Sequence, residues 1–340
     1  MDHQEFIILN IPALIRLFAL TALSAILAFL WTPFLTNLLY KYNWRKRIRQ
    51  GETPIYSSLH AQKAQTPTMG GLLIWLTVMV VTLLFNLSRE QTWLSLFALV
   101  AAGIVGAFDD LLNIKGIGPQ GGGLGGRHKL LIQLLIAGIG AWWFAYKLDW
   151  VYRPIHIPGV GDYILGIWFI LLFILVIVAT TNAVNITDGL DGLAGGLLAL
   201  AYMAYGVIAF VQNQLGIAVF CGCIAGALLA FLWFNIYPAR FFMGDTGSMS
   251  LGATLGVVAM LTNQVLVLPI IGFVFVIETL SVILQIFWRK FFKKKLFLST
   301  PLHHHLEAQG WPETKVTMRL WVIGAVFAVI GMVIALIGRG

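Results

Sequence analysis

Long apolar runs separated by short polar segments place the strongest limit on how this chain can fold. A transmembrane helix needs about 20 consecutive apolar residues, because the hydrocarbon core of a bilayer is about 30 Å thick. Ten runs approach or exceed that length, at residues 11–39, 69–87, 91–108, 130–146, 164–181, 190–211, 215–234, 248–261, 265–288 and 316–337. The first run is too long for the apolar core of a signal peptide and indicates a retained helix. The sequence therefore predicts an all-α integral membrane protein with about ten transmembrane helices.

The composition agrees with a chain that folds in lipid. Of the 340 residues, 59% are hydrophobic and 11% are charged, whereas soluble proteins carry about 25% charged residues. This excludes a soluble enzyme, a disordered chain and a disulfide scaffold. Cys221 and Cys223 stand two apart inside an apolar run, which favours packing over redox chemistry or zinc binding. Since no repeat is visible and the glycine-rich stretch 116–126 is the only candidate linker in the sequence, we expect one domain over residues 1–340.

The basic residues are distributed unevenly between the loops. Ten spans place both termini on one side of the membrane and the odd-numbered loops on the other, and those loops hold 17 of the 22 Lys and Arg residues. Because cytoplasmic loops are rich in these residues, both termini are predicted to lie outside, in the periplasm. The net charge of +8 suits nucleic acid, anionic lipid or a phosphorylated substrate. The basic cluster at 289–295 suits either a lipid anchor or a substrate role.

Five carboxylates fall on the predicted cytoplasmic side. Asp109 and Asp110 end the third run, Asp188 and Asp191 open the sixth, and Asp245 lies between the seventh and eighth. Asp188 can be explained as a helix N-cap. The adjacent pair cannot, because two acids at a helix C-terminus repel each other and face the negative end of the helix dipole. We therefore expect a functional pair that a metal ion or a lysine neutralises.

Two polar segments accompany these acids. Asn182, Asn185, Asp188 and Asp191 recur every third residue, and Gly189 and Gly192 between them permit a break in the helix. This predicts a turn that binds a sugar or a base, with oxygen ligands that suit Mg²⁺. The glycines around Asp245, in residues 241–248, indicate a helix start that binds phosphate and metal, with simple turn formation as the alternative.

A run of three histidines and one buried acid complete the candidates. His303, His304 and His305 would project about 100° apart on a helix, which favours hydrogen bonding to phosphate over joint binding of zinc. Their internal position argues against a tag remnant. Glu278 is the lone acid deep in a predicted span. It suits either proton coupling in a transporter or a buried hydrogen bond.

Together these segments resemble the polyprenyl-phosphate N-acetylhexosamine-1-phosphate transferases, over residues 60–321. The triple histidine resembles the branch of that family that acts on muramoyl-pentapeptide. The resemblance is carried by Lys63 with Thr66-Pro67-Thr68-Met69-Gly70-Gly71, by Phe108-Asp109-Asp110, by residues 182–193 and 234–248, and by Pro301-Leu302-His303-His304-His305 with Gly310-Trp311-Pro312. This sequence departs from the family pattern at Gln65, where a glycine is usual, and in the glycine-rich segment 121–126.

The resemblance implies a single polytopic transmembrane catalytic domain that forms a homodimer and depends on Mg²⁺. Its active site would lie on the cytoplasmic face of the bacterial inner (plasma) membrane. The implied reaction transfers phospho-MurNAc-pentapeptide from UDP-MurNAc-pentapeptide to undecaprenyl phosphate, which yields lipid I and UMP in the first membrane step of peptidoglycan synthesis. Its partners would then be these two substrates and membrane lipid, with no nucleic acid.

The resemblance also implies roles for individual residues. Asp109, Asp110, Asp245 and His304 would be catalytic, and Asp245 would bind Mg²⁺. Both direct attack by the lipid phosphate and a covalent aspartyl step remain open. The substrate-binding residues would be Lys63, Thr68, Lys129, Asn182, Asn185, Asp188, Gly189, Leu190, Asp191, Asn235, Phe242, His303 and His305.

Three alternatives compete with this interpretation. A sister transferase would move another N-acetylhexosamine-1-phosphate, but the triple histidine argues against it. A transporter would use Glu278, and a structural scaffold would need no acidic pair. The carboxylates gathered on one face favour chemistry at a membrane surface over transport through the midplane.

Overall fold

The protein is a bundle of long helices with one small β-hairpin. The computed structural model describes residues 3–45, 63, 65–88, 90–119, 122–150 and 153–338, with side chains from residue 11 onward. Lys46, Arg47, Arg49, Arg89, Gly121, Arg339 and His60, where the resemblance begins, lie outside the described residues. The elements are α1 (His3–Lys41), α3 (Gly71–Phe85), α4 (Trp93–Lys115), α5 (Gly126–Tyr146), β1 (Ile155–Ile157), β2 (Gly161–Tyr163), α6 (Trp168–Thr187), α7 (Leu193–Val211), α8 (Leu215–Asn235), α9 (Gly244–Leu261), η4 (Val265–Val267), α10 (Leu268–Ile271), α11 (Phe273–Phe292), α12 (Leu302–Ala308) and α13 (Glu313–Ile337).

The helices confirm an integral membrane protein. Within the described part of the chain, α1, α4, α5, α6, α7, α8 and α13 are long and apolar enough to cross a membrane. Helix α3 is apolar but shorter, with 15 residues, and α9, with 18, is less apolar than those seven. The short antiparallel hairpin β1–β2 was not predicted from the sequence.

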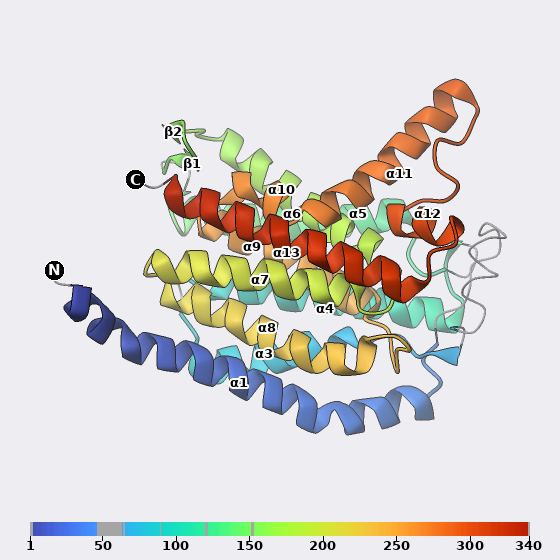
Figure 1. Cartoon of the computed structure of the whole chain (residues 1–340), viewed down its shortest axis with the longest axis horizontal. Coiled ribbons are helices and arrows are strands. Elements are labelled where there is room, and N and C mark those ends of the chain that lie inside the picture. The colour runs from blue at the N-terminus through green and yellow to red at the C-terminus, as the bar shows by residue number, and fades with distance from the viewer. Residues whose placement is uncertain are drawn as a thin grey trace.

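The ninth run does not form one continuous helix. It is divided into η4–α10 and α11, which are bent by 81° relative to each other. The break falls at Gly272, whose ψ of 28° departs from helical geometry. Figure 1 shows α11 leaving the bundle obliquely and ending beyond the other helices. The prediction of a single long helix over 265–288 was therefore wrong.

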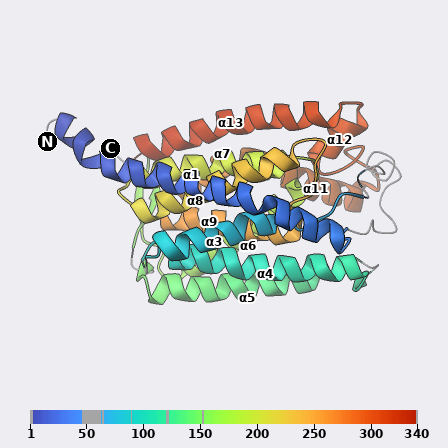
Figure 2. The ribbon, with the colours of Figure 1, turned by 90° about the horizontal axis from the view of Figure 1, so that it is seen from below.

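Helix α9 is the central element of the bundle. All of its residues from Gly244 to Leu261 are buried, and it contacts α3, α4 and α6. Figure 2 shows α13 on one face of the bundle, α4 and α5 on the opposite face, and α9 between them. Small residues allow this close packing. The central position of α9 brings its N-terminus, with Asp245, against α4.

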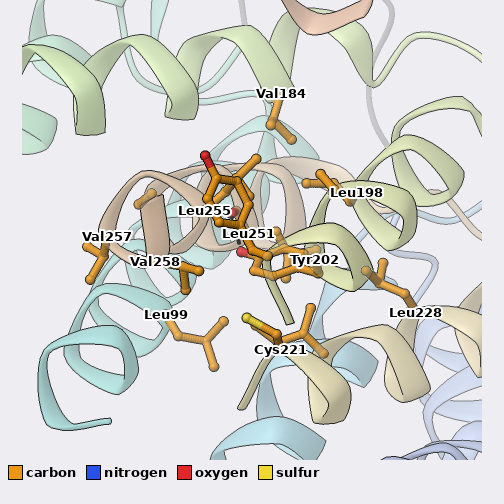
Figure 3. Close-up of a cluster of buried hydrophobic side chains, with 14 of the residues drawn as sticks. Leu99, Val184, Leu198, Tyr202, Cys221, Leu228, Leu251, Leu255, Val257 and Val258 are labelled. Atoms are coloured by element: carbon orange, nitrogen blue, oxygen red, sulfur yellow. Dashed lines mark hydrogen bonds between the residues drawn. The ribbon is translucent and has the colours of Figure 1, made fainter. Parts of the chain in front are cut away.

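The core next to α9 is built mainly from aliphatic side chains. Figure 3 shows Leu251 and Leu255 of α9 facing side chains from neighbouring helices, among them Tyr202 and Cys221. The Tyr202 hydroxyl donates a hydrogen bond to the Leu251 carbonyl at 2.7 Å, so its one polar atom is satisfied within the core. Cys221 and Cys223 are both free and buried, which confirms the prediction that they serve packing.

The contact between α4 and α9 predicts a large effect of one methyl group. A Cβ added at Gly106 would lie 2.2 Å from the Asp245 carbonyl oxygen, whereas one added at Gly138 on α5 meets no atom within 4 Å. Gly106→Ala is expected to lower the free energy of unfolding by about 1–3 kcal/mol through overpacking. Thermal denaturation in detergent measures this, with Gly138→Ala as the matched control. Equal midpoints for the two variants would contradict the close packing.

The two ends of the bundle differ. The start of α1 and the end of α13 lie at the same end in Figure 1, and α12 lies at the opposite end. The exposed residues Arg289, Lys290 and Lys293–Lys295 lie at and just beyond the far end of α11. The polar residues discussed next gather at the α12 end of the bundle.

Candidate active site

The acidic pair lies inside α4 and not at its end. Asp109 and Asp110 are 2% and 1% exposed, and the helix continues to Lys115, where Gly116 ends it with a left-handed backbone. The predicted helix end was wrong because apolar residues continue the helical face beyond the pair. Two buried acids side by side require compensating partners, and the structure supplies a different one for each.

Lys129 compensates Asp109. It lies in the first turn of α5, and its ammonium forms an ion pair with Asp109 Oδ2 and another, at 2.5 Å, with Asp245 Oδ2. One cation thus bridges carboxylates from α4 and α9. The sequence argument that a metal or a lysine should neutralise the pair is met here by the lysine. Opposite charges at this distance in a buried site attract strongly.

Asp110 is held by the N-terminus of α9. Its Oδ2 accepts a hydrogen bond from the Thr246 amide at 3.0 Å, at the helix end whose free amides favour anions. Gly244 precedes this amide with a φ of +75°, and a Cβ there would lie 2.6 Å from both Asp110 Oδ2 and the Thr68 hydroxyl. The Thr68 hydroxyl is buried and has no hydrogen-bond partner among the described residues. The amide at this helix start thus binds a carboxylate of the protein itself, and the phosphate and metal binding expected of residues 241–248 stays a prediction.

The glycine-rich segment after α4 folds back onto the acids. The Leu124 amide donates to Asp109 Oδ1 at 2.5 Å, so this carboxylate is held by a backbone amide on one oxygen and by Lys129 on the other. Sequence analysis missed Leu124, since its contribution comes from the backbone. The only sequence feature that pointed to this backbone contact was the glycine-rich segment around Leu124.

The two asparagines of α6 have different partners. Asn185 Nδ2 donates to Ser248 Oγ at 2.8 Å and to Asp245 Oδ1 at 3.3 Å. Asn182 Nδ2 instead donates to Gln133 on α5 at 2.8 Å. Residues three apart on a continuous helix project about 60° apart, and here the two side chains reach different partners. We call Asp109, Asp110, Lys129, Asn185 and Asp245 the acidic cluster, which Asn182 does not join.

The chain turns at residues 188–192, between α6 and α7. Asp188 follows the last residue of α6 as its C-cap, and α7 begins at Leu193 after Gly192, whose φ is +76°. Asp188 is therefore not the N-cap of the next helix, as the sequence allowed, because the helix before it extends to Thr187. Leu190 is buried. Asn235, at the end of α8, accepts the Gly192 amide at 3.0 Å, which confirms the predicted break and fixes its position.

A second group of charges lies at this turn. Lys63 Nζ pairs with Asp191 Oδ1 at 2.6 Å and also with Glu313 Oε1. The ammonium lies 5.9 Å from the centre of the Phe242 ring, within cation–π range. We call Lys63, Asp191, Phe242 and Glu313 the turn cluster. The two clusters are joined through the segment from Phe242 to Asp245, and sequence analysis missed Glu313.

The three histidines point to three different partners. They lie on α12, where His303 Nδ1 is 3.0 Å from Glu278 Oε2 and His304 Nδ1 is 2.8 Å from Glu307 Oε2. His305 Nδ1 accepts a hydrogen bond from the Leu298 amide at 3.2 Å. Their divergence agrees with the predicted 100° spacing. Glu278 and His303 are both fully buried, so the lone acid of the ninth run makes the buried hydrogen bond that was one of its two interpretations.

The acidic cluster has the donor chemistry of a magnesium site. Mg²⁺ is usually held by one or two carboxylates together with substrate phosphates and waters. The described residues contain no set of three His, Cys, Asp or Glu arranged around a metal position. Asp109 and Asp245 nevertheless converge on one point, and the cation there is the Lys129 ammonium. Two carboxylate oxygens directed at one cation position fit Mg²⁺.

The fold and the site define a class of membrane-embedded transferases. The sequence model of glycosyl transferase family 4 matches residues 92–263. This segment runs from α4 to the end of α9 and contains the whole acidic cluster. The class is therefore that of enzymes that transfer phospho-sugars in membranes, and this protein is a phospho-sugar transferase.

Curated relatives specify the family further. A phospho-N-acetylmuramoyl-pentapeptide-transferase of Geobacillus sp. strain WCH70 is 43% identical over 317 residues, which cover 92% of this chain and 97% of the relative. One from Chloroflexus aurantiacus is 40% identical over 338 residues, with 95% and 92% covered. One from Levilactobacillus brevis is 43% identical over 279 residues, with 80% and 85% covered. The chain belongs to the phospho-N-acetylmuramoyl-pentapeptide-transferase family, which confirms the resemblance.

Proposed function

We propose that this protein transfers phospho-MurNAc-pentapeptide from UDP-MurNAc-pentapeptide to undecaprenyl phosphate, with Mg²⁺ as cofactor, forming lipid I and UMP. The names of the relatives support the muramoyl-pentapeptide substrate. The observation that carries the proposal is a cation position between the buried carboxylates of Asp109 and Asp245, which the Lys129 ammonium occupies. A reaction between two phosphate-bearing substrates needs such a site, because charge must be neutralised where phosphates meet.

The chemistry then divides among the acidic cluster. An oxygen of the lipid phosphate bonds to the sugar-linked phosphorus of the donor, and the bond from that phosphorus to the bridging oxygen breaks, so that UMP leaves. Asp109 or Asp110 takes the proton of the lipid phosphate. In the covalent alternative, one of these carboxylates first bonds to the sugar-linked phosphorus as UMP leaves, and the lipid phosphate then displaces the carboxylate. Asp245 and Asp109 would hold Mg²⁺, which would supply neutralisation of charge on the diphosphate. Lys129 is placed to pair with a phosphate oxygen.

The turn cluster and its surroundings bind the donor in this proposal. Lys63, Asp191 and Phe242 bind the nucleotide end, and Asn185 binds the donor from the acidic cluster, where it contacts Asp245. His304 is buried on α12, with its Nδ1 against Glu307, and it orients the substrate in this proposal, while His303 and His305 fix the helix around it. The remaining members of the proposed binding set, argued from the family resemblance, are Thr68, Asn182, Asp188, Gly189, Leu190 and Asn235.

The same proposal gives the protein ten membrane crossings and two outer termini. Each of the ten apolar runs coincides with a helix or, for the ninth, with the bent pair. An even number of crossings is supported because the start of α1 and the end of α13 lie at the same end of the bundle (Figure 1). The exposed cations at the end of α11 suit anionic headgroups of the cytoplasmic leaflet. One catalytic domain in the bacterial inner membrane, with a cytoplasmic active site and a homodimeric state, follows from the family resemblance.

Release of UMP tests the proposed reaction directly. Detergent-purified protein is given undecaprenyl phosphate, Mg²⁺ and either UDP-MurNAc-pentapeptide or UDP-GlcNAc. We expect UMP with the muramoyl donor alone, and loss of the signal when EDTA is added, because the acidic cluster would lack its divalent cation. The control is protein in detergent without undecaprenyl phosphate.

Two other outcomes would overturn parts of the proposal. UMP from UDP-GlcNAc alone would keep the phospho-sugar transferase and reject the muramoyl donor. No UMP from either donor, in protein with a cooperative thermal transition, would reject the reaction and favour a transporter that uses Glu278. Neutralising Glu278 would then abolish proton-coupled uptake.

A further inference from the structure

Glu313, the first residue of α13, joins two parts of the turn cluster with a single oxygen. Its Oε1 accepts the Lys63 ammonium and also accepts the Asp191 amide at 2.7 Å. The Asp191 carboxylate pairs with the same ammonium through Oδ1 and accepts the Ala239 amide through Oδ2 at 3.0 Å. Lys63 and the turn at Asp191 are thus fixed relative to each other through Glu313.

The same face of α13 continues this contact along the turn. Thr317, one helical turn on, lies with its hydroxyl 3.4 Å from the Asp191 carbonyl, and the Trp321 indole donates to the Gly192 carbonyl at 3.2 Å. Residues four apart share a helix face. Glu313, Thr317 and Trp321 therefore form one edge of α13, and we call them the α13 edge.

The Glu313 carboxylate and the Asp191 carboxylate share the charge of one largely buried Lys63 ammonium. The side chains of Lys63, Asp191 and Glu313 are 17%, 3% and 10% exposed, so water screens their interaction only weakly. A hydrogen bond to a charged group contributes more than a neutral one, and an unpaired buried partner costs more again. Loss of the Glu313 charge would leave Lys63 with one carboxylate and free it to change position.

We propose that Glu313 is a positioning residue for the nucleotide end of the donor, and that it acts by fixing Lys63 and the Asp191 turn with the rest of the α13 edge. The inference rests on the proposed function, because it needs a nucleotide-linked donor at the turn cluster. Glu313 itself contacts none of the reacting groups in the acidic cluster. It therefore sets donor affinity and leaves the acceptor and the chemical step nearly unchanged.

Steady-state kinetics of Glu313→Gln test the proposal. Glutamine keeps an oxygen for the Asp191 amide and removes the charge that holds Lys63. The KM for the UDP-linked donor is expected to rise about 10-fold or more, as loss of a charge-assisted hydrogen bond predicts. The KM for undecaprenyl phosphate and kcat should stay within about 3-fold, the size of a weak secondary effect. Glu90→Gln is the matched control, because Glu90 is exposed and lies outside both clusters.

A double-mutant cycle with Lys63→Met separates positioning from general damage to the fold. If Glu313 acts through Lys63, the double variant raises the donor KM no further than Lys63→Met alone. A fall in kcat with both KM values unchanged would indicate a merely structural role and would reject the inference. So would a donor KM equal to that of the wild type, or strictly additive effects.

The failure of this inference and of the proposed function can be told apart. A wild type that releases no UMP rejects the proposed function. An active wild type with an equally active Glu313→Gln rejects only the positioning role. Thermal denaturation of each variant, with and without UMP, shows which of them fold and whether the nucleotide still stabilises them.

Discussion

Replacing Asp245 by alanine is expected to abolish transfer, with a loss of at least about 1,000-fold, the upper range for removal of one charge-stabilising group from an active site. Asp245 contacts both Lys129 and Asn185. Its loss removes one side of the proposed cation position and frees the lysine from α9. UMP release over a range of Mg²⁺ concentrations measures the effect, and any remaining activity should require more Mg²⁺ than the wild type.

The control for this variant is Asp162→Ala. Asp162 lies on β2, where it pairs with His156 at 2.8 Å, at the end of the bundle opposite α12 (Figure 1). Its replacement also removes one carboxylate from an ion pair and should leave UMP release within about 2-fold, as for a surface pair. Wild-type turnover in Asp245→Ala would reject the site assignment.

Asp109→Asn and Asp110→Asn are each expected to give a folded and nearly inactive protein. An asparagine oxygen can still accept the Leu124 amide at position 109 or the Thr246 amide at position 110, so the backbone contacts survive. The negative charge needed to hold a cation, or to take a proton from the lipid phosphate, is lost. UMP release should fall by at least about 100-fold, while the thermal midpoint stays close to that of the wild type.

Comparison of these two variants also distinguishes the carboxylates. Asp109 shares the Lys129 ammonium with Asp245 at the proposed cation position, so Asp109→Asn should change the Mg²⁺ requirement more than Asp110→Asn does. Full activity in either variant would remove that residue from the proposed chemistry. Unfolding of both variants would show that the fold needs the two negative charges. The hydrogen bonds from the Leu124 and Thr246 amides would then be too weak to hold it.

The helices were largely predictable because each is a long apolar run, and a run of this length has few alternatives in a bilayer. Their interruptions were harder to predict. Gly272 breaks the ninth run, yet many transmembrane helices contain glycine without breaking. Asp188 was expected at a helix start because aspartate often caps one, and only the tertiary structure shows that α6 extends up to it.

The candidate site was predictable as a set of residues and not as a set of pairs. Asp109, Asp110 and Asp245 were identified as charged residues in an apolar sequence. In the structure, Asp109 and Asp245 contact the Lys129 ammonium, and Asp110 contacts the N-terminus of α9. Nothing in the sequence pairs Glu278 with His303, or Glu313 with Lys63, because these partners come from distant segments. Contacts of this kind depend on which helix faces meet, which apolar periodicity alone does not determine.

The burial of α9 has a consequence for how the protein is inserted into the membrane. A helix is accepted from the insertion machinery according to its own affinity for lipid, and α9 carries Asp245 and several hydroxyl side chains among its 18 residues. Helices α4 and α6 precede α9 in the chain and contact it in the fold. They can therefore pack against α9 as it leaves the insertion machinery, which limits its exposure to lipid. The order of synthesis thus helps this buried helix, with its aspartate and hydroxyl side chains, to reach the centre of the bundle.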